Sequence, residues 1–198
     1  ELTKAKQTVA KGIRVLSVPP VMVTALLLFL SIWKPYFFRT WREIFICILL
    51  LGIVPALAYP LQKILPRWKK EGREGQRKLA FLFSLAGYTV SFLWSLTSGV
   101  GKEIQLICTT YFLSVLLLTV CNKGLHFRAS GHACSVTGPL LLLIYFVGEK
   151  CILPCIMAAG LIVWSSLILK RHTCRELAGG AVACMIAFAV SLWCVIYR

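Results

Sequence analysis

The stretch TTYFLSVLLLTV (residues 109–120) decides the fold class, because it carries no charged side chain. A second uncharged run, PLLLLIYFVG (139–148), follows it after the polar segment HFRASGH (126–132). Of the 198 residues, 59% are hydrophobic and 15% are charged, whereas soluble domains are about 45–50% apolar. The mean hydropathy is +0.81. The sequence therefore predicts an integral membrane protein.

Apolar segments recur along the chain, and several are shorter than the roughly 20 residues that a full membrane span needs. Backbone polar groups in hydrocarbon must be bonded within their own segment, so each segment predicts a helix. We expect an all-α, polytopic transmembrane helical bundle of six to seven membrane helices. A basic amphipathic N-terminal segment (1–17) precedes a single transmembrane domain (18–198). The apolar segments are about 18–33, 44–62, 79–97, 104–120, 133–147, 152–169 and 177–197.

The chain has a net charge of +15, from 22 Lys and Arg against 7 Asp and Glu. In a membrane protein this excess indicates orientation and attraction to anionic headgroups, so no nucleic-acid partner is expected. If each segment crosses once, the four most polar stretches emerge on one side and carry most of the Lys and Arg. The positive-inside rule then places that face in the cytoplasm, and we expect the protein in the plasma membrane. These stretches are 1–17, 64–78, 121–132 and 170–176.

Two histidines, His132 and His172, are 40 residues apart, which leaves room for two helices and a hairpin at GEK (148–150). At about 1.5 Å per residue, helices of similar length go out and return by similar distances. The two histidines are therefore expected at one membrane depth, facing each other. Glu176 follows His172 by four residues and shares its helical face. Its carboxylate can accept the Nδ1 proton of His172 and leave Nε2 free to attack.

Cationic and hydrogen-bonding side chains surround these histidines in the sequence. Guanidinium groups suit phosphate oxygens, and a Ser-Gly turn at a helix start adds hydroxyl and N–H donors. The nine cysteines mostly fall inside apolar runs and form no metal-ligand set with the histidines. The pattern indicates phosphoryl transfer without a metal or cofactor. The residues expected to bind a phosphate are Arg73, Arg77, Arg128, Ser130, Gly131, Lys170 and Arg171.

Each of these residues also has a simpler interpretation. His126 is isolated and is expected to be a bystander near the membrane interface. The basic stretch 64–78 is also typical of an anchor loop that contacts anionic lipid. Ser130 can simply cap the following helix, and Glu176 can simply complement a helix start.

The stretches RASGH (128–132) and SSLILKRHTCRELAGG (165–180) resemble two motifs of the type 2 phosphatidic acid phosphatase (PAP2) family, which is related in fold to vanadium haloperoxidases. Those motifs read Pro-Ser-Gly-His, and Ser-Arg, five residues, His, three residues, Asp. The resemblance covers residues about 60–197 and implies a PAP2-like fold. It implies that His172 is the phosphorylated nucleophile, that Glu176 orients it in place of aspartate, and that His132 protonates the leaving oxygen.

The chain departs from the family pattern at several positions. Ala129 stands where the second motif has proline, and Arg128 lies where some members carry a cation. Ser166 stands where the third motif has its arginine. The first motif is Lys, six residues, Arg-Pro, and its nearest counterpart is GREGQRK (72–78), which contains Arg73 and Arg77. Alternates for these two cations are Lys70 and Lys78.

The sequence and the resemblance together predict a metal-independent membrane lipid phosphatase, a phosphoric monoester or diphosphate hydrolase that acts through a phosphohistidine. Its expected substrate is isoprenyl diphosphate, phosphatidate or phosphatidylglycerol phosphate. One alternative is a lipid phosphotransferase of the same fold. A second is a non-catalytic membrane protein that binds anionic lipid or a protein partner. The sequence indicates neither the particular lipid nor an oligomeric state.

Overall fold

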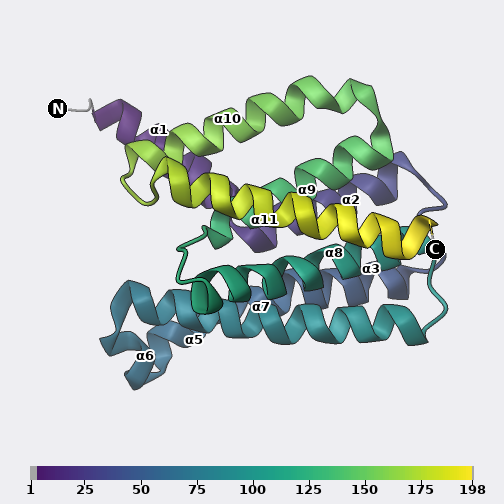
Figure 1. The fold of residues 1–198 in the computed structure, drawn as a ribbon, viewed down its shortest axis with the longest axis horizontal. Coiled ribbons are helices and arrows are strands. Elements are labelled where there is room, and N and C mark those ends of the chain that lie inside the picture. Colours follow the sequence, from purple (N-terminus) through teal and green to yellow (C-terminus); the bar gives the residue numbers. More distant parts are fainter. Residues whose placement is uncertain (1–3, 198) are drawn as a thin grey trace.

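The computed structural model describes residues 4–197, which form a helical bundle with no strand in that range. The long helices run roughly along one axis, and the two ends of the chain lie at opposite ends of the bundle (Figure 1). Wider π-helical turns, Ile48–Ile53, Val120–Gly124 and Trp193–Tyr197, and a 3₁₀ turn, Glu149–Cys151, continue several helices. The α-helices are α1 (Lys4–Leu16), α2 (Pro19–Trp33), α3 (Trp41–Cys47), α4 (Val54–Ala56), α5 (Ala58–Ile64), α6 (Pro66–Lys70), α7 (Gly72–Thr97), α8 (Lys102–Thr119), α9 (Gly131–Val147), α10 (Ile152–Ile168) and α11 (Cys174–Leu192).

Five continuous helical stretches of the described chain are long and apolar enough to cross a membrane. The pair α1 and α2, bent by 61°, gives a sixth if it counts as one span. Helix α9 is apolar but has 17 residues, which is short for a full crossing. The bundle therefore has five or six candidate spans where the sequence predicted six to seven membrane helices. The five are Trp41–Ile64, Gly72–Thr97, Lys102–Gly124, Glu149–Ile168 and Cys174–Tyr197.

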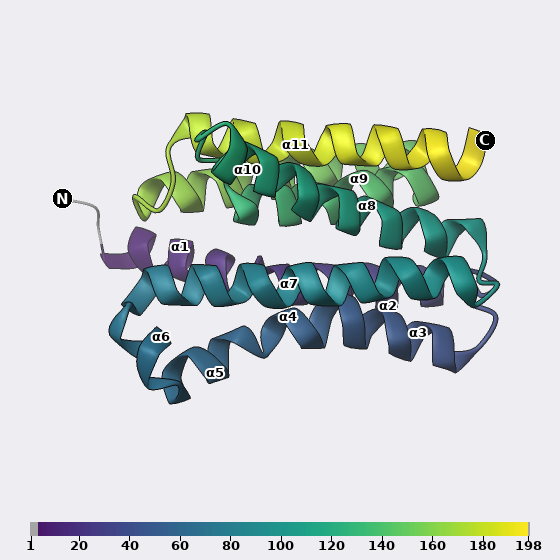
Figure 2. The ribbon, with the colours of Figure 1, turned by 60° about the horizontal axis from the view of Figure 1, so that its bottom comes forward.

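Helices α8 to α11 lie on one side of the bundle, and α1, α2, α7 and the segments from α3 to α6 lie on the other (Figure 2). Helix α8 joins the two sides because it packs against both α7 and α11. The main core lies where α2, the Ile48–Ile53 turn and α8 meet, with fully buried Leu27, Leu51, Ile104 and Ile107. This apolar core holds the helices together, and the polar side chains described below lie near the helix ends.

Within the amphipathic segment expected at 1–17, Lys4–Leu16 forms α1, which packs against α10, and residues 1–3 lie outside the described range. The Ser165 hydroxyl of α10 donates a hydrogen bond of 2.7 Å to the carbonyl oxygen of Ala10, which is fully buried. Two prolines begin α2, where a missing N–H costs nothing, and the chain bends there. Helix α1 is therefore held against the last helices of the chain.

The segment just before α9 is held directly on the first turns of α11. Ser130 N donates to the carbonyl oxygen of Glu176 at 2.9 Å. Gly179 and Gly180 permit this approach, because a Cβ at either position would overlap an atom of the segment. At Gly179 that atom belongs to the Phe127 ring, and at Gly180 it is the Ser130 carbonyl oxygen. The close contact brings the N-terminal ends of α9 and α11 together.

The substitution Gly180→Ala is expected to destabilise the protein by about 1–3 kcal/mol, the usual range for overpacking. The new methyl group would overlap a backbone oxygen, which cannot rotate away, so the Ser130 segment would have to move. The measurement is the thermal unfolding midpoint in detergent. Gly160→Ala is the matched control in α10, because its Cβ would meet no atom within 4 Å. Equal midpoints for the two variants would contradict the prediction.

Candidate functional site

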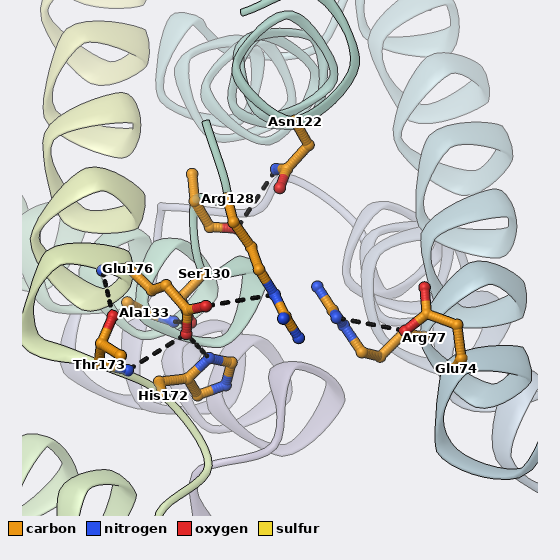
Figure 3. A network of polar contacts seen from close by, with 10 residues as sticks. Glu74, Arg77, Asn122, Arg128, Ser130, Ala133, His172, Thr173 and Glu176 are labelled. Atoms are coloured by element: carbon orange, nitrogen blue, oxygen red, sulfur yellow. Dashed lines mark hydrogen bonds and ion pairs between the residues drawn. The ribbon is translucent and has the colours of Figure 1, made fainter. Parts of the chain in front are cut away.

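Polar side chains from distant parts of the sequence meet at one end of the bundle (Figure 3). His132 lies in the first turn of α9, and Glu176 in the first turn of α11. His172 comes from the connection between α10 and α11, and Arg128 from the segment before α9. Arg77 projects from the beginning of α7 on the opposite side (Figure 3). The site is thus built where helix ends converge.

The two histidines of this site are parallel neighbours. The ring centroids of His132 and His172 are 6.4 Å apart, and the ring planes differ by 6°. Nδ1 of His172 lies 3.2 Å from Oε2 of Glu176, so the predicted contact between ring and carboxylate is present. An ionised carboxylate only accepts hydrogen bonds, so Nδ1 carries the proton and Nε2 keeps a lone pair.

Glu176 connects three parts of the site. Its Oε2 also accepts a hydrogen bond of 3.2 Å from Thr173 N, and the Thr173 hydroxyl accepts one from Glu176 N. These reciprocal bonds are a capping box that begins α11. Its Oε1 pairs with Arg128 Nε at 3.2 Å. Glu176 therefore makes both contacts considered from the sequence, one with the start of α11 and one with the ring of His172.

The surroundings of His172 favour its neutral form. Burial contributes most to a pKa below the ordinary value of 6.5, and the side chain is only 12% exposed. The positive charges of Arg14 and Arg77 lower the pKa further, while the hydrogen bond and charge of Glu176 oppose the shift. At neutral pH the Nε2 lone pair is therefore available as a nucleophile.

Ser130 is buried and caps α9, since its hydroxyl oxygen accepts a hydrogen bond of 3.2 Å from Ala133 N. The hydroxyl proton is still free to be donated to a ligand, because a serine oxygen can accept and donate at once. Gly131 is the exposed first residue of α9. Asn122 holds the preceding turn, with its side-chain amide donating to the carbonyl of Ala129 at 3.2 Å.

The predicted cations are placed unequally. The guanidinium groups of Arg77 and Arg128 point toward one another across the site (Figure 3). Arg73 and Arg171 both lie close enough to Arg14 for their charges to repel it. Lys170 is exposed at the end of α10, and the described residues offer it no hydrogen bond or ion pair with the site.

Two acidic side chains lie among these arginines. Glu74 contacts Arg77 at 3.4 Å, but both side chains are exposed, at 58% and 43%. The carboxylate of Glu176 already contacts both Arg128 and His172. The positive charge of the cluster therefore exceeds the negative charge that the contacting carboxylates supply, which suits an anionic ligand.

Arg14 of α1 and Ser17, the residue that follows α1, reach the site, although the sequence pattern assigned neither of them to it. The Ser17 hydroxyl lies 3.3 Å from Nε2 of His132, and the charge of Arg14 acts on His172. The sequence does indicate a shared helical face here, because Ala10, Arg14 and Ser17 are spaced by four and three residues. Nothing local, however, indicated that this face packs against residues more than a hundred positions away.

Two other sequence features, His126 and Ser166, make no polar contact with either site histidine among the described residues. His126 is exposed with a φ of 50°, and the described chain gives it no polar contact with the site. Ser166 is buried in α10, and its carbonyl accepts a hydrogen bond from Arg171 N at 3.0 Å. Among residues 4–197, no group of three or more His, Cys, Asp or Glu side chains could hold a metal ion.

Known proteins provide no independent assignment of this site. No protein-family model, no curated protein and no solved structure matches the chain. The similarity to PAP2 motifs stays a prediction from the sequence. The chemistry of the site therefore rests on the contacts of its own residues.

Proposed function

We propose that the protein is a metal-independent lipid phosphatase of the PAP2 type. The observation that carries this proposal is the parallel pair His132 and His172, with the second ring hydrogen-bonded to Glu176 among arginines that exceed their contacting carboxylates in charge. A histidine oriented by a carboxylate is a suitable nucleophile toward phosphorus. A neighbouring histidine is the usual kind of group that transfers protons in such a reaction.

The proposed reaction has two steps. Nε2 of His172 forms a bond to phosphorus while the bond between phosphorus and the lipid oxygen breaks, and the imidazolium form of His132 gives that oxygen a proton and becomes neutral. A water molecule then gives a proton to His132 and attacks phosphorus, which breaks the phosphorus–nitrogen bond and releases phosphate. Arg77 and Arg128 bind the phosphoryl oxygens, whose charge they stabilise in both steps. Ser130 and Gly131 donate hydrogen bonds from the start of α9.

A lipid substrate agrees with the place of the site in the bundle. His172 and Glu176 lie where two candidate spans, Glu149–Ile168 and Cys174–Tyr197, adjoin, so a headgroup can reach them while its tails remain in the bilayer. An apolar groove between α8 and α11, lined by Leu117, Phe127 and Val182, suits part of such a tail. Phe127 directly precedes Arg128, so the groove begins beside the basic cluster.

The proposed substrates are phosphatidate, phosphatidylglycerol phosphate and isoprenyl diphosphates, because each joins a phosphate to hydrocarbon tails. The Lys and Arg bias among the polar stretches supports a plasma-membrane orientation with this site on the cytoplasmic face. The remaining cations of the 64–78 stretch then face anionic headgroups.

The test is phosphate release by the purified protein in detergent with EDTA. The panel contains dioleoyl phosphatidate, phosphatidylglycerol phosphate and farnesyl diphosphate. We expect release from at least one of them, with no loss of rate in EDTA and with inhibition by orthovanadate. Phosphate that moves only to an added alcohol would indicate the phosphotransferase instead. No release and no transfer from the whole panel would contradict the proposal and favour a non-catalytic lipid-binding protein.

A further inference from the structure

One face of α1 and of the residue that follows it lies against α9 and α10. Ala10, Arg14 and Ser17 lie on that face, because their spacing of four and three residues matches the helical repeat. Contacts fix both ends of the face. Ala10 accepts the hydrogen bond of Ser165, and Ser17 lies 3.3 Å from Nε2 of His132. Arg14, between them, is therefore directed toward the histidines.

The Arg14 side chain is half-buried, and one nitrogen of its guanidinium has no acceptor in the described chain. Its Nη1 is buried and has no hydrogen-bond partner within the described chain 4–197. The charged groups that act on it most strongly are Arg171 and Arg73, and both repel it. A buried charged donor without an acceptor is unfavourable, so this arrangement is stable only if something else satisfies it. An anion between these guanidinium groups would supply the acceptor and remove the repulsion.

We propose that Arg14 is a ligand of the substrate phosphate, supplied by the N-terminal helix beside the two histidines. The inference rests on the proposed function and names a residue that the motifs do not contain. A dianionic phosphate monoester fits this position because a guanidinium can bond two of its oxygens at once. Ser17, three residues after Arg14 on the same face, lies 3.3 Å from Nε2 of His132, so an anion bound to Arg14 lies near the histidines.

The test compares phosphate affinity among Arg14→Gln, Arg14→Lys and the unchanged protein, by calorimetry with inorganic phosphate and by competition with dioleoyl phosphatidate in micelles. We expect Arg14→Gln to weaken the binding of both ligands at least tenfold. Arg14→Lys should weaken it less, because lysine keeps the positive charge but cannot bond two phosphate oxygens at once as a guanidinium does. Lys11→Gln is the matched control, since Lys11 is an exposed cation of the same helix. It should bind both ligands like the unchanged protein.

Several outcomes would overturn the inference. One is unchanged affinity for both ligands in an Arg14→Gln protein that unfolds at the normal temperature. Another is an equal loss of binding to phosphatidylglycerol vesicles, which carry no phosphate monoester, because the arginine would then act only on the membrane surface. If Arg14→Gln does not fold, a tenfold or smaller loss in Arg14→Lys supports the inference, and identical affinity overturns it.

Failure of this inference differs from failure of the proposed function. A protein that hydrolyses lipid phosphates equally well with and without Arg14 keeps the function and loses the inference. A protein that binds phosphate through Arg14 but hydrolyses none of the panel keeps the inference and loses the function.

Discussion

The His172→Asn protein is expected to release no phosphate above background from any lipid that the unchanged protein hydrolyses. Removing a nucleophile that forms a covalent intermediate lowers kcat on the order of 10³-fold or more. Asparagine keeps an N–H group that can donate to Glu176, which now lies 3.2 Å from Nδ1 of His172. The variant therefore removes Nε2 while keeping a hydrogen-bond donor for Glu176.

Two measurements check this prediction. The first is phosphate release, followed over hours. For the second, the protein is incubated with a ³²P-labelled substrate and quenched in alkali, in which phosphohistidine is stable. The unchanged protein should retain label that acid removes, and His172→Asn should retain none. His126→Asn is the control, because His126 is exposed and outside the site. Phosphate release by His172→Asn at the normal rate would disprove the assignment of the nucleophile.

The His132→Asn protein is expected to lose about 10²–10⁴-fold in kcat on lipid substrates, the usual contribution of general acid–base catalysis. The lipid oxygen is a poor leaving group and needs the proton of His132. p-Nitrophenolate leaves without protonation, so the first step with p-nitrophenyl phosphate should be nearly normal. The second step, hydrolysis of the phosphohistidine, should be slow, because no histidine is left to accept a proton from the attacking water.

Rapid mixing of His132→Asn with p-nitrophenyl phosphate should therefore give a burst of nitrophenolate close to one equivalent, followed by a slow steady rate. Labelled phosphohistidine should accumulate over the same time. Equal losses with the lipid and with the nitrophenyl ester, and no burst, would show that His132 has a structural role. Thermal unfolding of the variant separates that outcome from simple misfolding.

The sequence predicted the fold class and the central contacts because both depend on local spacing. Long uncharged runs are sufficient to predict membrane helices, and four residues between His172 and Glu176 are sufficient to predict one shared face. The meeting of His132 and His172 required only two helices of similar length. The number of spans was less predictable, because α9 ends after 17 residues and prolines divide α1 from α2.

The sequence did not predict the contribution of α1, because it depends on packing between residues far apart in the chain. Arg14 and Ser17 belong to a basic amphipathic segment, a pattern equally typical of a helix lying on a membrane surface. The approach of Ser130 to Gly180 is likewise a tertiary contact. Lys170 stays a prediction: it lies two residues before His172 in the sequence, but among the described residues its side chain makes no hydrogen bond or ion pair with the site.

The docking of α1 also determines when the site can form during synthesis. Ser17 and His132 are separated by 115 residues, and Ala10 and Ser165 by 155. The N-terminal part of a chain emerges from the ribosome first, so α1 must wait for its partners until α9 and α10 have been made. His172 and Glu176 follow later still. The nascent chain therefore enters the membrane before the proposed phosphate site is complete, and His172 and Glu176 join it only when almost the whole bundle has been made.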